Sequence, residues 1–498
     1  MSDILKGTSL LTVGDVLTRL FDLVRVIVIT HVFSVAEYGL FSLAVGTALI
    51  LAGFAMPSFG AVVLQFFPQY QKEDEECEEG SGGKKGGGRA AATFFSSSMM
   101  ILLFNGLIFM GLFVFLANWV GTIYYQKPEI TMLLYFAASM IVLSPFVSNL
   151  LQFFFSLNRF KSIFAMNALG GLMNLLFVLL FVYLGLGIPG LILAYVISEA
   201  SKVLLALVLL RKYMIFTVPR LSKEIWSFWK PLIATAIFKA FTNHLPTVLI
   251  GRLLDTFAIG IYNIVDRTLR LTFSMLDPYL MTIKAVAIRT STHSREKFLQ
   301  ILNQHNTYTV LACIFVIGLM PIVFGPLGFS LLYGDEYMSA LPYFFVYTIF
   351  GVIGTVNGSF PRVIYSVANK NNYYLLVTVL TSVVQLSLML WLMLWLGLWG
   401  LILSLVVGRL IGLSLNIYFS KRADEGFSVP ALLGPLSLYA VLVVLGVLSS
   451  FFVEISFSWI VLLLTFVYIW AASLLGFIEY RTFVPGIYKE LRKLVHHQ

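Results

Sequence analysis

The sequence predicts an all-α polytopic membrane protein: fourteen transmembrane helices, forming two parallel six-helix lobes around a central cavity plus two C-terminal helices. Three observations predict this fold. Of the 498 residues, 59% are hydrophobic and only 11% are charged, long apolar runs recur along the chain, and the chain repeats itself internally. A soluble globular protein carries about 25% charged residues. The composition therefore excludes a cytosolic enzyme and a secreted domain.

The apolar runs define the predicted helices, since a membrane-spanning helix needs about 20 mostly apolar residues. Fourteen runs meet this length: 8–33, 39–65, 92–117, 130–156, 162–184, 189–210, 228–252, 256–283, 304–326, 340–365, 373–396, 399–420, 430–452 and 457–478. Very short breaks at Gly185–Pro189 and Leu396–Trp399 make the flanking helices antiparallel neighbours.

The Lys and Arg residues of the loops orient the chain, because these residues are enriched in cytoplasmic loops. If the N-terminus is inside, nearly all of them fall on the inside, and the outside has only Lys127 and, at a helix end, Arg252. We therefore expect both termini to be cytoplasmic. The net charge of +9 follows from the same bias and does not indicate a nucleic-acid partner.

One inside loop has an unusual composition. Residues 71–88 read QKEDEECEEGSGGKKGGG, which offers no apolar surface to bury and predicts a disordered cytoplasmic loop. Cys77 has no second Cys or His nearby, so we expect no metal site there. The other cysteine, Cys313, is too distant to suggest a disulfide framework.

The repeat is visible as glycines and prolines at constant offsets. Gly39 and Gly260 each open an apolar run, and Pro57 and Pro278 each interrupt that run; both pairs are 221 residues apart. Two later pairs, Gly187 with Gly397 and Gly190 with Gly400, are 210 residues apart. Each half holds an even number of helices, so both enter the membrane from the same side. Residues 1–220 and 221–430 are the expected lobes, followed by helices within 431–478 and a cytoplasmic tail at 479–498. Such repeats place a substrate site between two lobes and alternate its access.

Charged residues at membrane depth are costly and therefore usually face a cavity. The first run carries Asp15, Arg19, Asp22 and Arg25, which fall within an arc of about 120° on a helix. The spacings also allow ion pairs along the helix. We therefore expect this arc either to line a cavity or to form an ion-paired packing stripe.

Further deep charges lie in later runs. Asp266 and Arg270 are spaced as an i,i+4 pair, which leaves Arg267 less compensated. The balance of the deep charges is cationic and suits an anionic ligand such as a diphosphate head group. The predicted substrate-binding residues are Arg19, Arg25, Lys239, Arg267, Arg270 and Arg409. The candidate coupling residues are Asp15, Asp22, Glu199 and Asp266.

Absent motifs narrow the function. The chain has no P-loop, no HExxH and no CxxC motif, and its outside loops are too short for a catalytic domain. We therefore expect a protein that is not an enzyme and that uses no metal and no cofactor.

Four short segments carry a family resemblance. They read LKGTS at 5–9, FSVAEYG at 33–39, NRF at 158–160 and YGDEY at 333–337. Over nearly its whole length the chain resembles the polysaccharide-biosynthesis flippases, the O-antigen-type branch of the multidrug/oligosaccharidyl-lipid/polysaccharide exporter superfamily. The chain departs from this family pattern in two places. Ala258–Gly260, the second-half counterpart of AEYG at 36–39, lacks the glutamate, and the loop at 71–88 is unusually acidic.

The resemblance implies a transporter of the cell (plasma or inner) membrane. It would flip a polyprenyl-diphosphate-linked oligosaccharide from the cytoplasmic to the outer leaflet for cell-surface glycan biosynthesis. Its partners would be this lipid-linked oligosaccharide and membrane lipids, with glycan polymerases or glycosyltransferases as candidates. Two alternatives stay open: a multidrug exporter of the same superfamily, which should have an acidic cavity, and a membrane-embedded glycan ligase or glycosyltransferase, which should have a long outer loop.

Overall fold

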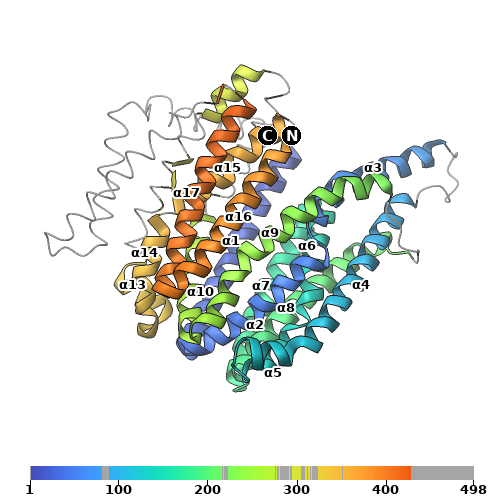
Figure 1. Cartoon of the computed structure of the whole chain (residues 1–498). Helices are drawn as coiled ribbons and strands as arrows, with labels where there is room; N and C mark the ends of the chain where they lie inside the picture. Colours follow the sequence, from blue (N-terminus) through green and yellow to red (C-terminus); the bar gives the residue numbers. More distant parts are fainter. Residues whose placement is uncertain are drawn as a thin grey trace. The chain divides into compact units, whose positions relative to one another are not determined.

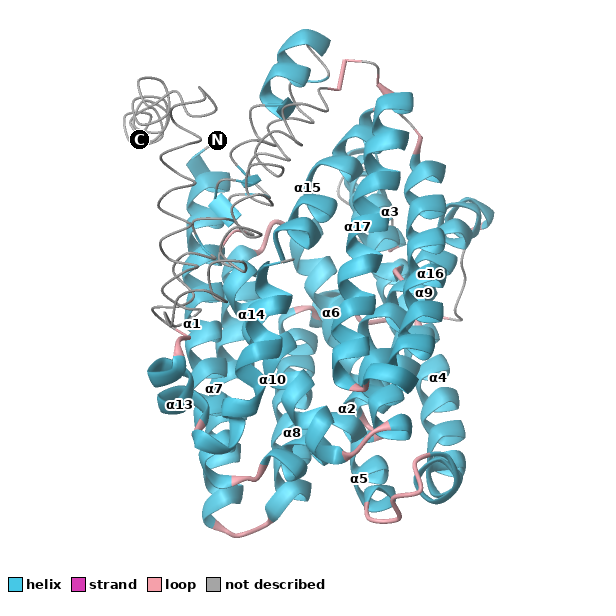
Figure 2. Cartoon of the chain, turned by 60° about the vertical axis from the view of Figure 1, so that its left-hand side comes forward, coloured by secondary structure: helices cyan, strands magenta, loops and turns pink. Residues whose placement is uncertain are grey.

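The computed structural model describes residues 2–80, 89–215, 217, 222–274, 276, 280, 291, 294–303, 309–310, 312–313, 316, 324–349, 351–368, 370–424 and 426–427. Within these ranges every regular element is a helix and none is a strand (Figure 2). The chain divides into two compact units, Asp3–Asn263 and Ile264–Gln498, and the boundary lies within one helix, α10 (Thr256–Ser274). The predicted all-α class is confirmed.

The first unit is built mainly from long helices (Figure 1). They are α1 (Ser2–Val32), α2 (Val35–Ala55), α3 (Phe59–Gly80), α4 (Ala90–Trp119), the π-helical turn η1 (Val120–Tyr124), α5 (Ile130–Ala137), α6 (Met140–Ser156), α7 (Phe160–Tyr183), α8 (Gly187–Leu209), the 3-10 turn η2 (Arg211–Tyr213) and α9 (Lys223–Leu253). The start of α10 completes the unit.

The second unit holds the rest of α10 and the later helices. They are α13 (Pro326–Tyr333), the 3-10 segment η3 (Asp335–Ala340), α14 (Leu341–Ile349), α15 (Gly351–Val367), α16 (Asn371–Leu396) and α17 (Leu398–Ala423). The runs predicted at 430–452 and 457–478, and most of the run at 304–326, lie outside the described residues.

In the described part of the chain, eight helical segments are long and apolar enough to cross a membrane, or up to nine if one bent pair is a single span. The protein is therefore a multi-pass membrane protein; the predicted number of fourteen helices is not tested. Helices α1 and α10 are not among these segments, and both carry charges along their length. They are the helices on which the sequence predicts most of the deep charges.

Two tight helical hairpins follow from glycines at the turns. Helices α7 and α8 are joined through Gly185 and Gly187, with φ of 67° and 59°, and α16 and α17 are joined through Gly397, with φ of 55°. An L-residue with a side chain rarely adopts this left-handed conformation, so glycine fixes both turns. Gly187 and Gly397 are partners in the predicted repeat, and both have a positive φ.

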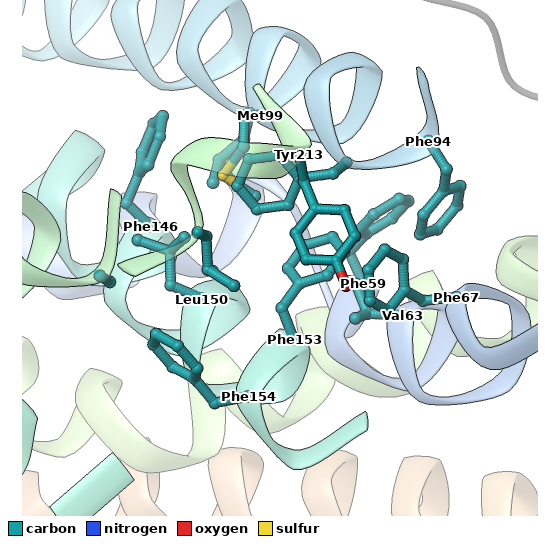
Figure 3. Packing of buried hydrophobic residues seen from close by; sticks show 14 of the residues in the cluster. Phe59, Val63, Phe67, Phe94, Met99, Phe146, Leu150, Phe153, Phe154 and Tyr213 are labelled. Atoms are coloured by element: carbon teal, nitrogen blue, oxygen red, sulfur yellow. The ribbon is translucent and has the colours of Figure 1, made fainter. Parts of the chain in front are cut away.

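An aromatic cluster packs α3, α4, α6 and η2 together (Figure 3). The Phe153 ring lies edge-on to Phe67 and Phe95, with ring centroids 4.9 Å and 4.8 Å apart, which is a favourable arrangement of aromatic rings. Tyr213 joins the cluster, and its hydroxyl accepts a hydrogen bond from Gln71 Nε2 at 3.0 Å. The cluster therefore ties the segment that follows α8 to α3.

Helix α3 is longer than the sequence suggests. It continues to Gly80, so the expectation of disorder over 71–88 does not hold for residues 71–80; residues 81–88 lie outside the described ones. The carboxylate of Asp74 accepts hydrogen bonds from the backbone N–H groups of Ala90 and Ala91, at 2.8 Å and 3.0 Å. These are otherwise unpaired amides at the start of α4, so Asp74 caps that helix from a distance.

Candidate functional site

The run predicted as one helix over 39–65 is broken into α2 and α3 by Met56–Ser58. Pro57 cannot donate a backbone hydrogen bond and its ring disturbs the preceding turn, and Ser58 has a left-handed φ of 54°. The carbonyl of Pro57 accepts a hydrogen bond at 2.7 Å from the indole N–H of Trp229, on α9. Irregular backbone at membrane depth is tolerated where protein buries it or where it lines a cavity.

A cavity of about 300 Å³ lies beside this break, within the first unit. Its walls come from the end of α2, the start of α3, the middle of α6 and the middle of α9. The lining residues are Leu49, Ala52, Gly53, Met56, Pro57, Ser58, Phe59, Gly60, Ser144, Pro145, Ser148, Asn149, Ala236, Lys239, Ala240, Asn243 and His244.

Small residues bring the walls of the cavity close together. A Cβ on Gly53 would lie 2.6 Å from the Cβ of Ala240, so α2 and α9 touch directly there. A Cβ on Gly60 would lie 2.6 Å from Cγ of Gln152, on α6. Neither glycine leaves room for a side chain, so the helices around the cavity are in close contact at its edges.

Lys239 gives the cavity its charge. It is the one charged residue among the lining residues when histidine is counted as neutral, and none of them is a carboxylate. Among the residues that the structure describes, the Lys239 ammonium has no hydrogen-bond or ion-pair partner. Lys239 is exposed and lies on the candidate membrane span Leu232–Leu253, and an unpaired lysine on such a span favours an anionic ligand.

Asn149 contributes a second polar group that its neighbours do not satisfy. Its Nδ2 donates a hydrogen bond to the Pro145 carbonyl at 2.9 Å, whereas its buried Oδ1 accepts none from the described residues. The side chain is only 3% exposed. Most buried side-chain polar atoms in proteins have a hydrogen-bond partner, so this oxygen requires an explanation.

The sequence does not single out Asn149, Ser144 and Ser148, which all lie on α6. The available signal is the segment SPFVSN at 144–149, where polar residues spaced by four and a proline interrupt an apolar run. This spacing places Ser144 and Ser148 on one helix face. It does not indicate which helix that face meets.

The charges of α1 divide between two faces. A Cβ on Gly14 would lie 2.6 Å from the Phe164 ring, and one on Gly171 would lie 3.1 Å from Phe21, so α1 packs against α7 here. Arg25 falls about 20° from Gly14 around the helix and therefore shares the packed face. It forms an ion pair of 2.8 Å with Asp22, as the spacing predicts.

The remaining predicted charges of α1 lie elsewhere on the helix. Arg19 falls about 140° from Gly14, away from the face that packs on α7. It has an interaction partner of its own. The side chain of Asp15 lies outside the described residues, so its predicted pairing with Arg19 is not tested. Neither residue lines the cavity at the α2–α3 break.

Glu199 has a partner that the sequence does not identify. Its buried carboxylate forms an ion pair of 2.5 Å with Lys202, one turn later on α8. The stem of Lys202 occupies the space that a side chain on Gly170 of α7 would fill. The adjacent Ser198 hydroxyl donates to the Gly170 carbonyl at 2.7 Å, so this charge pair is packed into the hairpin of α7 and α8.

In the second unit, Asp266 and Arg270 form the predicted i,i+4 ion pair at 2.7 Å. Arg267 has an interaction as well, so it is not isolated; the expectation that it is less compensated than its neighbours is not tested. The Arg409 guanidinium lies 4.2 Å from the ring centroid of the buried Tyr347, a cation–π contact. These residues and Lys239 belong to different units.

The two more specific sequence motifs prove to be structural. In FSVAEYG, Ser34 and Glu37 form a capping box at the start of α2. In YGDEY, Gly334 has a φ of 85° and directs the fully buried Tyr333 and Tyr337 into the second unit. The Tyr333 hydroxyl lies 2.8 Å from that of Thr268, within hydrogen-bond distance. Both motifs therefore shape the fold rather than the cavity.

Comparisons with solved structures find the same fold in transporters. The chain matches the lipid II flippase MurJ in an inward closed conformation with a TM-score of 0.70 and 13% identity, over 94% of this chain and 99% of that one. An inward-facing multidrug resistance MATE transporter matches with a TM-score of 0.63 and 14% identity, over 82% and 95%. A transporter of the MOP superfamily from Pyrococcus furiosus matches with a TM-score of 0.55 and 14% identity, over 86% and 96%.

The sequence itself also matches a family. No curated protein sequence matches the chain. A family model described as polysaccharide biosynthesis protein matches residues 4–283, which is more than half of the chain and includes every residue that lines the cavity. The chain belongs to the polysaccharide biosynthesis protein family.

Proposed function

We propose that this protein is a transporter that flips a polyprenyl-diphosphate-linked oligosaccharide from the cytoplasmic to the outer leaflet by alternating access. The observation that carries the proposal is the cavity beside the α2–α3 break, which presents the unpartnered Lys239 and no carboxylate. An ammonium in a membrane cavity stabilises a phosphate group, and a broken helix is a common feature of transporter binding sites. The fold shared with a lipid II flippase supports the same function.

The proposal extends to residues outside this cavity. Arg19, Arg25, Arg267, Arg270 and Arg409 are proposed to act with Lys239 on the diphosphate at some stage of the cycle. Asp15, Asp22, Glu199 and Asp266 are the proposed coupling groups. Residues 1–220 and 221–430 are the proposed moving lobes, with both termini in the cytoplasm.

A multidrug exporter is the second candidate, because MATE transporters share the fold. An exporter of cationic drugs would need acidic groups in its cavity, and the described cavity has none. A membrane-embedded glycan ligase or glycosyltransferase would need catalytic groups on an outer loop. The connections between α7 and α8 and between α16 and α17 are too short to hold such groups.

The test is reconstitution in liposomes with a fluorescent polyprenyl-diphosphate glycan, scored for transfer between leaflets. Lys239→Gln removes the charge from the cavity, and Arg267→Gln removes one on α10. A charge-assisted hydrogen bond contributes about 1.5–3 kcal/mol, so losing one should weaken binding roughly ten- to a hundredfold. We expect this loss of transport at subsaturating substrate, with melting temperatures unchanged.

Lys72→Gln is the matched control, since Lys72 is a highly exposed lysine that pairs with Glu76 at 3.7 Å far from the cavity. It should transport at the wild-type rate. The proposal fails if stable Lys239→Gln and Arg267→Gln variants also transport at that rate. Export of a cationic drug by the wild type, without glycan transfer, would instead support the second candidate.

A further inference from the structure

The cavity beside the α2–α3 break holds two kinds of polar group. Lys239 can donate hydrogen bonds to a ligand and carries a positive charge, and the start of α3 at Phe59 and Gly60 also borders the cavity. The first amides of a helix lack carbonyl partners in that helix and attract anions. Asn149 differs from these groups, because its free side-chain oxygen can only accept a hydrogen bond.

The combination indicates a ligand that has an anionic group and a hydrogen-bond donor close together. A phosphate satisfies Lys239 and the amides of α3, but a fully ionised diphosphate has no proton to donate to Asn149. A sugar attached to that diphosphate has hydroxyl groups that do. A volume of about 300 Å³ lies at the small end of ligand pockets, which suits a head group with its first sugar and not a whole oligosaccharide.

Resting on the proposed function, we propose that Asn149 is a specificity-determining residue for the sugar next to the diphosphate. Its Oδ1 accepts a hydrogen bond from a hydroxyl or amide N–H of that sugar while Lys239 holds the diphosphate. Ser144 and Ser148 border the same side of the cavity, one on each side of Pro145, and offer further hydrogen bonds to sugar hydroxyls.

A site built to hydrogen-bond a substrate hydroxyl rejects an analogue that lacks it, because the buried protein group is then left unpaired. A protein with Asn149 should therefore discriminate between glycosylated and bare lipid diphosphates. A water molecule bonded to Oδ1 would satisfy the same oxygen without creating this preference. The two explanations predict different binding to the two lipids.

The experiment compares two fluorescent probes with the detergent-purified full chain: a polyprenyl diphosphate, and the same lipid carrying one N-acetylhexosamine. The wild type should bind the glycosylated probe more tightly. Asn149→Leu keeps the branched shape and the number of heavy atoms but has no acceptor, and should weaken binding of the glycosylated probe about tenfold while leaving the bare diphosphate unaffected. Lys239→Gln should weaken both probes to the same extent.

Asn149→Thr should restore the preference. A threonine hydroxyl can donate to the carbonyl four residues earlier, as Thr18 and Thr242 do at 2.8 Å and 2.7 Å, and its oxygen still accepts a hydrogen bond. Asn174→Leu is the matched control, since Asn174 is a buried asparagine on α7 that does not line the cavity. It should keep the wild-type preference, and melting temperatures verify folding of each variant.

Each remaining outcome overturns a specific claim. If Asn149→Leu weakens both probes equally, or neither, Asn149 does not read the sugar. The same conclusion follows if the wild type binds the two probes equally while Lys239→Gln still weakens both, and the proposed function then survives. If the wild type binds neither probe, the proposed function fails together with this inference.

Discussion

Gly39 of α2 and Gly260 of α10 lie against each other in a reciprocal contact. A Cβ on Gly39 would lie 3.1 Å from the backbone nitrogen of Gly260 and would clash with the carbonyl of Thr256. A Cβ on Gly260 would clash with the carbonyl of Val35. The offset of 221 that relates the two glycines also relates Val35 to Thr256. Each glycine thus makes room for the equivalent carbonyl of the other helix. A local twofold axis between the two helices would produce this reciprocal contact.

The helix starts on either side of this contact match as well. Ser34 caps α2 and accepts a hydrogen bond from the Glu37 N–H at 3.3 Å. Asp255, its counterpart at the same offset, accepts one from the Ala258 N–H at 2.7 Å. The second half therefore lacks the acid of AEYG without losing its helix cap, because aspartate replaces serine as the capping residue.

Gly39→Ala and Gly260→Ala should each destabilise the protein. The added methyl group meets backbone carbonyls, which cannot move aside as a flexible side chain would. Overpacking of this kind costs about 1–3 kcal/mol. We expect a clear fall in melting temperature for each variant. Gly111→Ala is the control, because nothing lies within 4 Å of a Cβ there and alanine favours helices. Equal melting temperatures for all three variants would contradict the close contact.

The ion pair of Glu199 and Lys202 leads to a second prediction. Removing one partner leaves the other charge buried, which costs about 3–5 kcal/mol, whereas removing both leaves no uncompensated charge. Glu199→Gln and Lys202→Gln should therefore each lower the melting temperature strongly, and the double variant should recover most of the loss. Additive losses in the double variant would show that the two side chains do not act as a pair.

The same variants test the proposed coupling role of Glu199. If the stable double variant still transports lipid-linked glycan at the wild-type rate, Glu199 serves folding and not coupling. The exposed pair of Lys72 and Glu76 is the matched control. Ion pairs on the surface contribute only about 0–1 kcal/mol to stability. Single variants of Lys72 or Glu76 should therefore have the melting temperature of the wild type.

Relations within one helix or one turn could be predicted from the sequence. Asp22 with Arg25 and Asp266 with Arg270 form the expected ion pairs, because helical periodicity alone makes these residues neighbours. The turn at Gly397 is predictable for a similar reason, since its left-handed backbone requires a residue without a Cβ.

Relations between helices could not be predicted in this way. Lys202 reaches Glu199 on its own helix, but its place over Gly170 depends on how α7 meets α8. The cap that Asp74 provides to α4 spans a loop whose composition alone indicates disorder. The unsatisfied oxygen of Asn149 becomes apparent only once α6 is packed beside the α2–α3 break. A single sequence specifies the faces of each helix, not which faces meet.

Lys127 gives a prediction about pH. Its ammonium donates hydrogen bonds to the carbonyls of Gly251 and Leu254 at the end of α9, at 2.7 Å and 3.2 Å. Burial lowers the pKa of Lys127 below its ordinary value of 10.5, against the opposing effect of the Asp255 and Glu129 carboxylates. Between the lowered pKa and 10.5 the unfolded chain therefore binds more protons than the folded one, so stability contributed by this group rises with pH in that window.

Lys127→Met removes this titration. The melting temperature of the wild type minus that of the variant should therefore increase as the pH rises from neutral towards 10.5. Other titrating groups are common to both proteins and cancel in the difference. A decrease of this signed difference over the same range would show that folding favours the charged lysine and would contradict the lowered pKa.

The hydrogen bond between Trp229 and Pro57 should stabilise the break that forms the cavity. The Trp229 ring is buried and lies edge-on to Phe59, with centroids 5.1 Å apart. Trp229→Phe keeps an aromatic ring there but removes the N–H, which leaves the Pro57 carbonyl without its partner at a cost of about 1–3 kcal/mol. Because this carbonyl lies at the cavity wall, we expect a lower melting temperature and weaker binding of the polyprenyl diphosphate probe. Trp226→Phe, at a half-exposed tryptophan one turn earlier on α9, is the matched control and should change neither. If the two variants behave alike, the indole hydrogen bond does not stabilise the α2–α3 break, and the backbone of Met56–Ser58 holds its shape without α9.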